Sequence, residues 1–196
     1  MRFRKIHNKL ERLATKRGLI GLFLLSHTVL LLMMLFTFPR INAKFGTQAF
    51  DLKTFGYSQS EAIMMLGNLD QSTVDFYIFP QLFLLDVLYP FLLALFLSTV
   101  IIRLSDLIKM SRDHVFSNLF LLPFVAMFID YCENIMISLM ILNPTSVSSG
   151  LIKTASIFTQ MKGGFTTLSW LVIIILLVIW IINKRKSKKH ILHSML

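Results

Sequence analysis

Charged residues are scarce in this chain of 196 residues: they make up 15% of it, whereas soluble domains carry about 25%. Apolar and aromatic residues make up 55%. So few charges would leave a water-soluble domain with a largely apolar surface, which excludes that class of protein. The composition instead indicates a polytopic membrane protein.

Cysteine is almost absent too. The single Cys132 cannot form an internal disulfide, and no Cys/His spacing suggests zinc or redox chemistry. The sequence also lacks a Gly-rich phosphate loop, an HExxH zinc helix and a GxSxG nucleophile turn. We therefore expect no metal site and no cofactor.

Long apolar runs are what the chain has in place of these motifs. About 20 residues are needed to cross a hydrocarbon core as a helix. The first run is longer than the apolar part of a secretory signal, so we interpret it as a retained helix. We predict an all-α fold, a four-helix transmembrane bundle in a single membrane domain (1–196), with spans at 18–38, 78–102, 115–142 and 165–182.

The distribution of lysine and arginine predicts the orientation of the bundle. The segment before the first span holds seven, the 103–114 loop three, and the tail at 183–196 five, together 15 of the chain's 20. Positive residues near helix ends stay on the cytoplasmic side. We therefore expect both termini to be cytoplasmic, in a multi-pass protein of the cell membrane.

The same bias explains the net charge of +10. The run from Lys184 to Lys189 directly follows a span, where it attracts anionic lipid headgroups of the bilayer at about 1 kcal/mol per charge. No aromatic residues are interleaved with these charges to stack on bases. The expected partner is the lipid bilayer, and nucleic acid is excluded.

Two segments are predicted to lie outside the membrane, 39–77 and 143–164. Ser58 and Glu61 have capping-box spacing and precede an apolar helix that ends near Gly67, a short extracytoplasmic helix between spans 1 and 2. This helix lies on the outer membrane surface, packs as a lid over the bundle, or merely fills space between the spans. Apolar residues at helical spacing predict that the fourth helix begins near Leu151, which places Lys162 near the outer surface.

Three carboxylic acids interrupt the apolar spans. By helical rise, Asp86 lies about 12 Å, Glu133 about 13 Å and Asp130 about 18 Å below the outer helix ends. His27 lies about 16 Å deep in the first span. A charge in lipid costs roughly 3 kcal/mol or more, so such residues usually face a protein interior and mark a functional site.

Helical periodicity groups these residues further. Asp130, Glu133 and Asn134 share one face of the third helix, and Tyr89 lies one turn below Asp86. His27 and Asn134 can also be explained as packing residues that hydrogen-bond between helices. The candidate site for a ligand or proton comprises Asp86, Asp130, Glu133, Asn134, His27, Tyr89 and Lys162, with no metal.

Acids so close together repel one another in a medium of low dielectric constant, so we expect them to share a proton or bind a cation. Three functions remain open. The protein binds or translocates a proton, a cation or a lipid-like ligand from the outer side. Alternatively, it is a membrane-embedded enzyme acting on a lipid-linked substrate, or an accessory subunit whose acids pair with a partner membrane protein.

Several short runs carry a resemblance. They are Phe55–Ser58, the stretch from Pro80 to Pro90, Asp130–Asn134 and Phe158–Lys162. Together they resemble a family of small, uncharacterised bacterial four-span membrane proteins with GYS-like, LDxxxP-like and DYxEN-like motifs, over most of residues 55 to 170. The resemblance implies no activity, only that Asp86, Asp130, Glu133, Asn134 and Lys162 belong to one pattern.

Overall fold

The structure, a computed structural model, describes residues 2–110 and 115–193. All regular secondary structure in these two ranges is helical, as expected. In chain order the elements are α1 (Arg2–Leu13), α2 (Lys16–Leu32), the π-helix η1 (Met33–Thr37), α3 (Phe38–Phe45), the 3₁₀-helix η2 (Phe50–Leu52), α4 (Gln59–Gly67), α5 (Gln71–Phe76), the π-helix η3 (Tyr77–Leu85), α6 (Asp86–Leu107), the 3₁₀-helix η4 (Val115–Leu121), α7 (Leu122–Leu142) and α8 (Ser149–His193).

Four helical stretches in the described residues are long and apolar enough to cross a membrane, which confirms a multi-pass helical protein. They are Lys16–Phe45, Gln71–Leu107, Asn118–Leu142 and Ser149–Lys186. Three of them run beyond the predicted spans because local caps, not the loss of hydropathy, end the helices. Gly46, at φ 69°, ends α3, and the Asp70 side chain accepts from the amide of Thr73 to begin α5.

α6 is the central helix of the bundle. It packs against α2, α7 and α8, and α7 and α8 also pack against each other. Burial follows this arrangement: 56% of the most apolar window of Gln71–Leu107 is buried, against 11% of that of Lys16–Phe45. α2 therefore lies at the edge of the bundle with most of its surface exposed.

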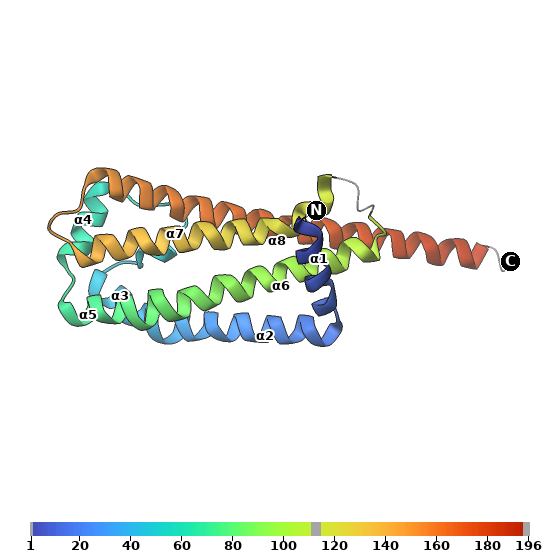
Figure 1. The fold of residues 1–196 in the computed structure, drawn as a ribbon, viewed down its shortest axis with the longest axis horizontal. Coiled ribbons are helices and arrows are strands. Elements are labelled where there is room, and N and C mark those ends of the chain that lie inside the picture. Colours follow the sequence, from blue (N-terminus) through green and yellow to red (C-terminus); the bar gives the residue numbers. More distant parts are fainter. Residues whose placement is uncertain (1, 111–114, 194–196) are drawn as a thin grey trace.

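The two ends of the bundle differ. In Figure 1, α3, α4, α5 and the connection between α7 and α8 lie together at one end, which we call the loop end. α1 lies across α6 towards the opposite end, and the C-terminal part of α8 extends beyond that end. Both termini are therefore remote from the loop end.

A kink interrupts the second span next to Asp86. Within η3, Phe79 has non-helical angles (φ −139°, ψ 124°), and Pro80 follows it. Proline lacks the amide hydrogen that a regular helix needs, so a bend is expected at this position. η1 is also a π-helix, and Thr37 in η1 donates a hydrogen bond to Gln81 in η3. The two irregular segments are thus joined to each other.

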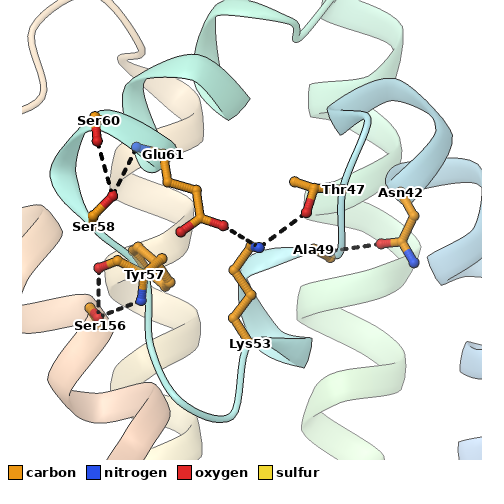
Figure 2. Close-up of polar contacts among 9 residues, drawn as sticks. All are labelled: Asn42, Thr47, Ala49, Lys53, Tyr57, Ser58, Ser60, Glu61 and Ser156. Atoms are coloured by element: carbon orange, nitrogen blue, oxygen red, sulfur yellow. Dashed lines mark hydrogen bonds and ion pairs between the residues drawn. The ribbon is translucent and has the colours of Figure 1, made fainter.

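The segment between α3 and α4 is attached to three helices, as Figure 2 shows. The amide of Ala49 donates to Asn42 Oδ1 of α3 at 2.7 Å, and Lys53 Nζ lies 2.5 Å from Glu61 Oε1 of α4. At the far end of the segment, the amide of Tyr57 donates to Ser156 Oγ of α8 at 2.9 Å. These bonds fix a non-helical segment over the loop end of the bundle.

The predicted capping box at the start of α4 is present. Ser58 Oγ accepts from the amide of Glu61 at 3.2 Å, as Figure 2 shows. The ammonium of Lys53, hydrogen-bonded to the Glu61 carboxylate, holds the pKa of Glu61 below its usual value. Apolar residues of α4 pack in a buried cluster with the aromatic side chains of the loop end: Phe45, Phe50, Tyr57, Ala62, Met65, Leu66 and Tyr77. α4 is therefore a packed part of the fold.

Candidate functional site

A buried ion pair joins α7 to α8. Lys162 Nζ lies 2.5 Å from Glu133 Oε2 and 3.4 Å from Asp130 Oδ1. Glu133 is completely buried, and its other oxygen, Oε1, accepts from the hydroxyl of Thr159 at 2.6 Å. The structure thus brings Lys162 of α8 to Asp130 and Glu133, the two acids that helical periodicity placed on one face of α7.

Asp86 lies close to this group but is not paired in the same way. Only 3% of its surface is exposed, and Oδ2 has no hydrogen-bond partner in the part of the chain that the structure describes. Asn134 Nδ2 of α7 donates to the Asp86 carbonyl oxygen at 3.1 Å, so it holds the start of α6 against α7. A buried carboxylate oxygen without a partner is costly, and it is the polar atom that a bound cation or proton would satisfy.

The loop end contributes a further acid, Asp51, which the sequence analysis missed. Asp51 belongs to η2, is 8% exposed, and its Oδ1 accepts from the hydroxyl of Tyr77 at 2.6 Å. Burial raises the pKa of Asp51, and the positive charge of Lys162 partly opposes this shift. The only signal in the sequence is an acidic residue between two apolar residues, Phe50 and Leu52. No helical periodicity surrounds it, so the sequence does not predict which way its side chain points.

The electrostatic effect of the acids reaches Tyr57, which is 9% exposed. Burial raises the pKa of the Tyr57 phenol well above its usual value, and the negative charge of Glu133 raises it further. The hydroxyl oxygen of Tyr57 has no hydrogen-bond partner among the described residues. Four carboxyl groups, those of Asp51, Asp86, Asp130 and Glu133, thus surround the one ammonium of Lys162.

A cavity of about 280 Å³ adjoins these charges, and we call it the acidic cavity. Asp51, Asp86, Asp130, Lys162 and Tyr89 give it one polar region. The rest of its wall is largely apolar and comes from α2, η1, α3, η2, the segment after η2, α6, α7 and α8. These residues are Leu30, Met33, Met34, Phe38, Leu52, Thr54, Pro90, Leu93, Ala94, Leu97, Pro123, Ala126, Met127, Gly163, Thr166 and Thr167.

His27 does not lie with the acids, and it does not share their depth in the bundle either. Its Nδ1 is 2.9 Å from the carbonyl oxygen of Phe23 and 3.1 Å from Ser26 Oγ. Its ring packs against Phe23 and Phe96, with centroids 4.0 and 6.0 Å away. Helical rise predicted that His27 shares one layer with the acids, and this prediction is wrong. Phe96 is ten residues from Asp86 on α6, about 15 Å along the helix, so the packing of α2 against α6 places the imidazole deeper in the bundle.

Comparisons with known proteins add no assignment: no family model, no curated protein and no solved structure matches the chain. The resemblance in the motifs remains a prediction. The residues and geometry of the acidic cavity are therefore the basis on which a function is proposed.

Proposed function

We propose that this membrane protein binds a cationic ligand in the acidic cavity. The observation that carries the proposal is the buried Asp86 Oδ2, an acceptor without a partner in the described chain, in a residue that lines this cavity. An ammonium or guanidinium group would satisfy this oxygen and balance the excess of carboxylates.

The arrangement favours an organic cation over a metal ion. Among the residues that the structure describes, no three His, Cys, Asp or Glu side chains are grouped in a way that would hold a metal. A proton is the smallest cation that could occupy Asp86, and its transfer between Asp86 and Asp130 would make the cavity part of a translocation route. Whether the cation is organic or a proton, the proposal requires that it binds at Asp86.

The proposal includes an orientation in the cell membrane, with the loop end outside and both termini in the cytoplasm. It is supported by the 15 of 20 lysines and arginines that the sequence places before the first span, in the 103–114 loop and in the tail at 183–196. The basic tail from residue 183 would then lie against anionic headgroups of the inner leaflet. Residues 111–114 of the predicted cytoplasmic loop and 194–196 of the tail lie outside the described residues.

Binding of a small cation tests the proposal directly. We expect nanodiscs that contain the protein to bind tritiated butylammonium above the level of empty nanodiscs, and Asp86→Asn to weaken this binding at least tenfold. Asp106→Asn is the matched control, because Asp106 is an exposed acid on the same helix. Absence of binding, or an equal effect of the two substitutions, would refute the proposal.

A second candidate, a membrane-embedded enzyme, is favoured by one contact. Lys162 Nζ lies 2.5 Å from Glu133 Oε2, so a proton could pass between a base and an acid that are already in place. The two functions differ in the fate of the ligand. A binding protein returns an amphipathic amine unchanged, whereas an enzyme would release a product, and Glu133→Gln would abolish its formation.

A further inference from the structure

The acidic cavity has a mouth, and the position of that mouth is informative. Three of its lining residues are exposed: Met34 in η1, Thr54 in the segment after η2, and Thr167 in α8. The opening therefore runs between η1 and α8, from Thr54 at the loop end to Thr167 further along the bundle. We call this opening the slit.

The slit faces the lipid because both of its long walls belong to membrane spans. Met34 lies within Lys16–Phe45 and Thr167 within Ser149–Lys186. Beside Met34, the apolar side chains of Leu35 and Phe36 are 65% and 67% exposed. At the loop end, Phe55 follows Thr54 and is 96% exposed, as expected for an aromatic residue at a membrane interface.

The interior of the cavity changes from polar to apolar along the bundle. Asp86 and Leu97 both line the cavity. They are 11 positions apart on α6, which corresponds to about 16 Å along the helix axis. Charged residues surround the Asp86 region, and Leu93, Leu97 and Pro123 form the wall at the other end. The cavity is thus long, charged at one end and apolar at the other.

The volume of the acidic cavity suits a charged head group and part of one apolar ligand chain. Pockets for small ligands span about 300 to 1,000 Å³, and the acidic cavity, at about 280 Å³, lies just below this range. A longer apolar chain could continue through the slit into the surrounding lipid without desolvating any polar group.

We propose that the ligand is an amphiphile with an ammonium or guanidinium head and a single apolar chain, and that it enters sideways from the bilayer through the slit. This inference rests on the proposed function and specifies its ligand class. The head binds between Asp86 and Asp130, and the chain lies along Leu93 and Leu97 or leaves between Met34 and Thr167.

Blocking the slit tests the route separately from the site. In nanodiscs that contain the protein, we expect Met34→Trp and Thr167→Trp each to weaken binding of tritiated dodecylammonium at least tenfold, with empty nanodiscs subtracted. Butylammonium, which is small enough to pass the narrowed slit and too short to extend through it once bound, should bind both variants as it binds the wild type. Leu35→Trp, on the same π-helix but outside the cavity lining, is the matched control and should leave both amines unaffected.

The outcomes separate the two proposals. If the slit variants bind dodecylammonium normally while Asp86→Asn does not, the cation site stands and sideways access through the slit is refuted. Equal loss of butylammonium and dodecylammonium in the slit variants also refutes it, because the substitutions then damage the site itself. If Asp86→Asn binds both amines as tightly as the wild type does, the proposed function fails and the ligand class fails with it.

Discussion

At the scale of single residues, the acids of the site differ in whether each carboxyl oxygen has a hydrogen-bond or ion-pair partner. Glu133 has a partner for each oxygen, Lys162 and Thr159, whereas Asp86 and Asp51 each keep one oxygen without a partner in the described chain. Removing one partner of a buried pair leaves the other charge uncompensated, which is strongly destabilising. We infer that Lys162 and Glu133 keep the site folded, while Asp86 and Asp51 supply the carboxyl oxygens that bind a ligand.

Asp51 gives a prediction about pH. Because burial raises the pKa of Asp51 in the folded protein above the unfolded value of 3.8, the folded state binds more protons than the unfolded chain at pH values between the two pKa values. The stability contribution of Asp51 therefore falls as pH rises above about 4, until the folded pKa is passed. We expect Asp51→Asn to be more stable than the wild type at pH 7, by roughly 1 kcal/mol. At pH 4.5 the difference in stability between the two proteins should be smaller.

Thermal unfolding in detergent between pH 4.5 and 8 measures this difference. The asparagine Oδ1 can still accept from Tyr77, so charge is the main change. Asp51→Ala is the control, because it removes the acceptor and should lower the melting temperature over the whole pH range. A difference between wild type and Asp51→Asn that does not vary with pH would contradict this explanation.

At the scale of elements, irregular helices place the site. η1 supplies Met33 and Met34 to the cavity wall, and η3 ends immediately before Asp86. The hydrogen bond from Thr37 to Gln81 holds these two π-helices together. Single π-helical turns are often found at functional sites, because they redirect side chains that a regular helix would orient differently.

The contact between the loop segment and α8 gives a second prediction. A Cβ added to Gly163 would lie 2.8 Å from Thr54 Cγ2, so Gly163→Ala forces the Thr54 side chain, which lines the cavity, to shift. We expect it to lower the melting temperature despite the higher helix propensity of alanine, and to weaken butylammonium binding. Gly164→Ala is the matched control, since no atom lies within 4 Å of the added Cβ.

The gain in helix propensity from Gly164→Ala should be about 1 kcal/mol, so this variant should melt at the same or a higher temperature. Differential scanning fluorimetry on the two purified variants measures both effects. Equal behaviour of Gly163→Ala and Gly164→Ala would show that the Thr54 contact does not limit the packing of the loop segment.

At the scale of the whole molecule, the bundle is asymmetric. α6 is surrounded, whereas α2 is largely exposed along its length. The slit exists because α2 packs mainly on α6, so η1 and α8 are left as two walls with the cavity between them. The opening therefore follows from the arrangement of the spans.

The proposed orientation gives a prediction at this scale. In a Cys132→Ala background, a membrane-impermeant maleimide applied to intact cells should label Ser60→Cys, which lies at the loop end. Lys109→Cys, at the opposite end of the bundle, should be labelled only after the cells are permeabilised. Labelling of Lys109→Cys and protection of Ser60→Cys in intact cells would reverse the proposed topology.

The sequence by itself determined the class of the molecule and its local elements. Low charge and four apolar runs predicted a multi-pass helical protein, because hydropathy is a property of residues in lipid and needs no tertiary contact. The capping box of α4 and the start of the fourth helix near Leu151 were also predictable, since caps and periodicity act within a few residues.

Only the tertiary structure decided which of these residues meet. Helical rise gives depth along a span, but the rotation of each helix and its neighbours depend on packing over the whole bundle. The rise predicted similar depths for His27 and Asp86, yet packing places His27 at the level of Phe96 among aromatic rings and brings Lys162 to Glu133. Asp51 reaches the acidic cavity because a non-helical segment folds over the bundle, and no periodic pattern in the sequence encodes that path.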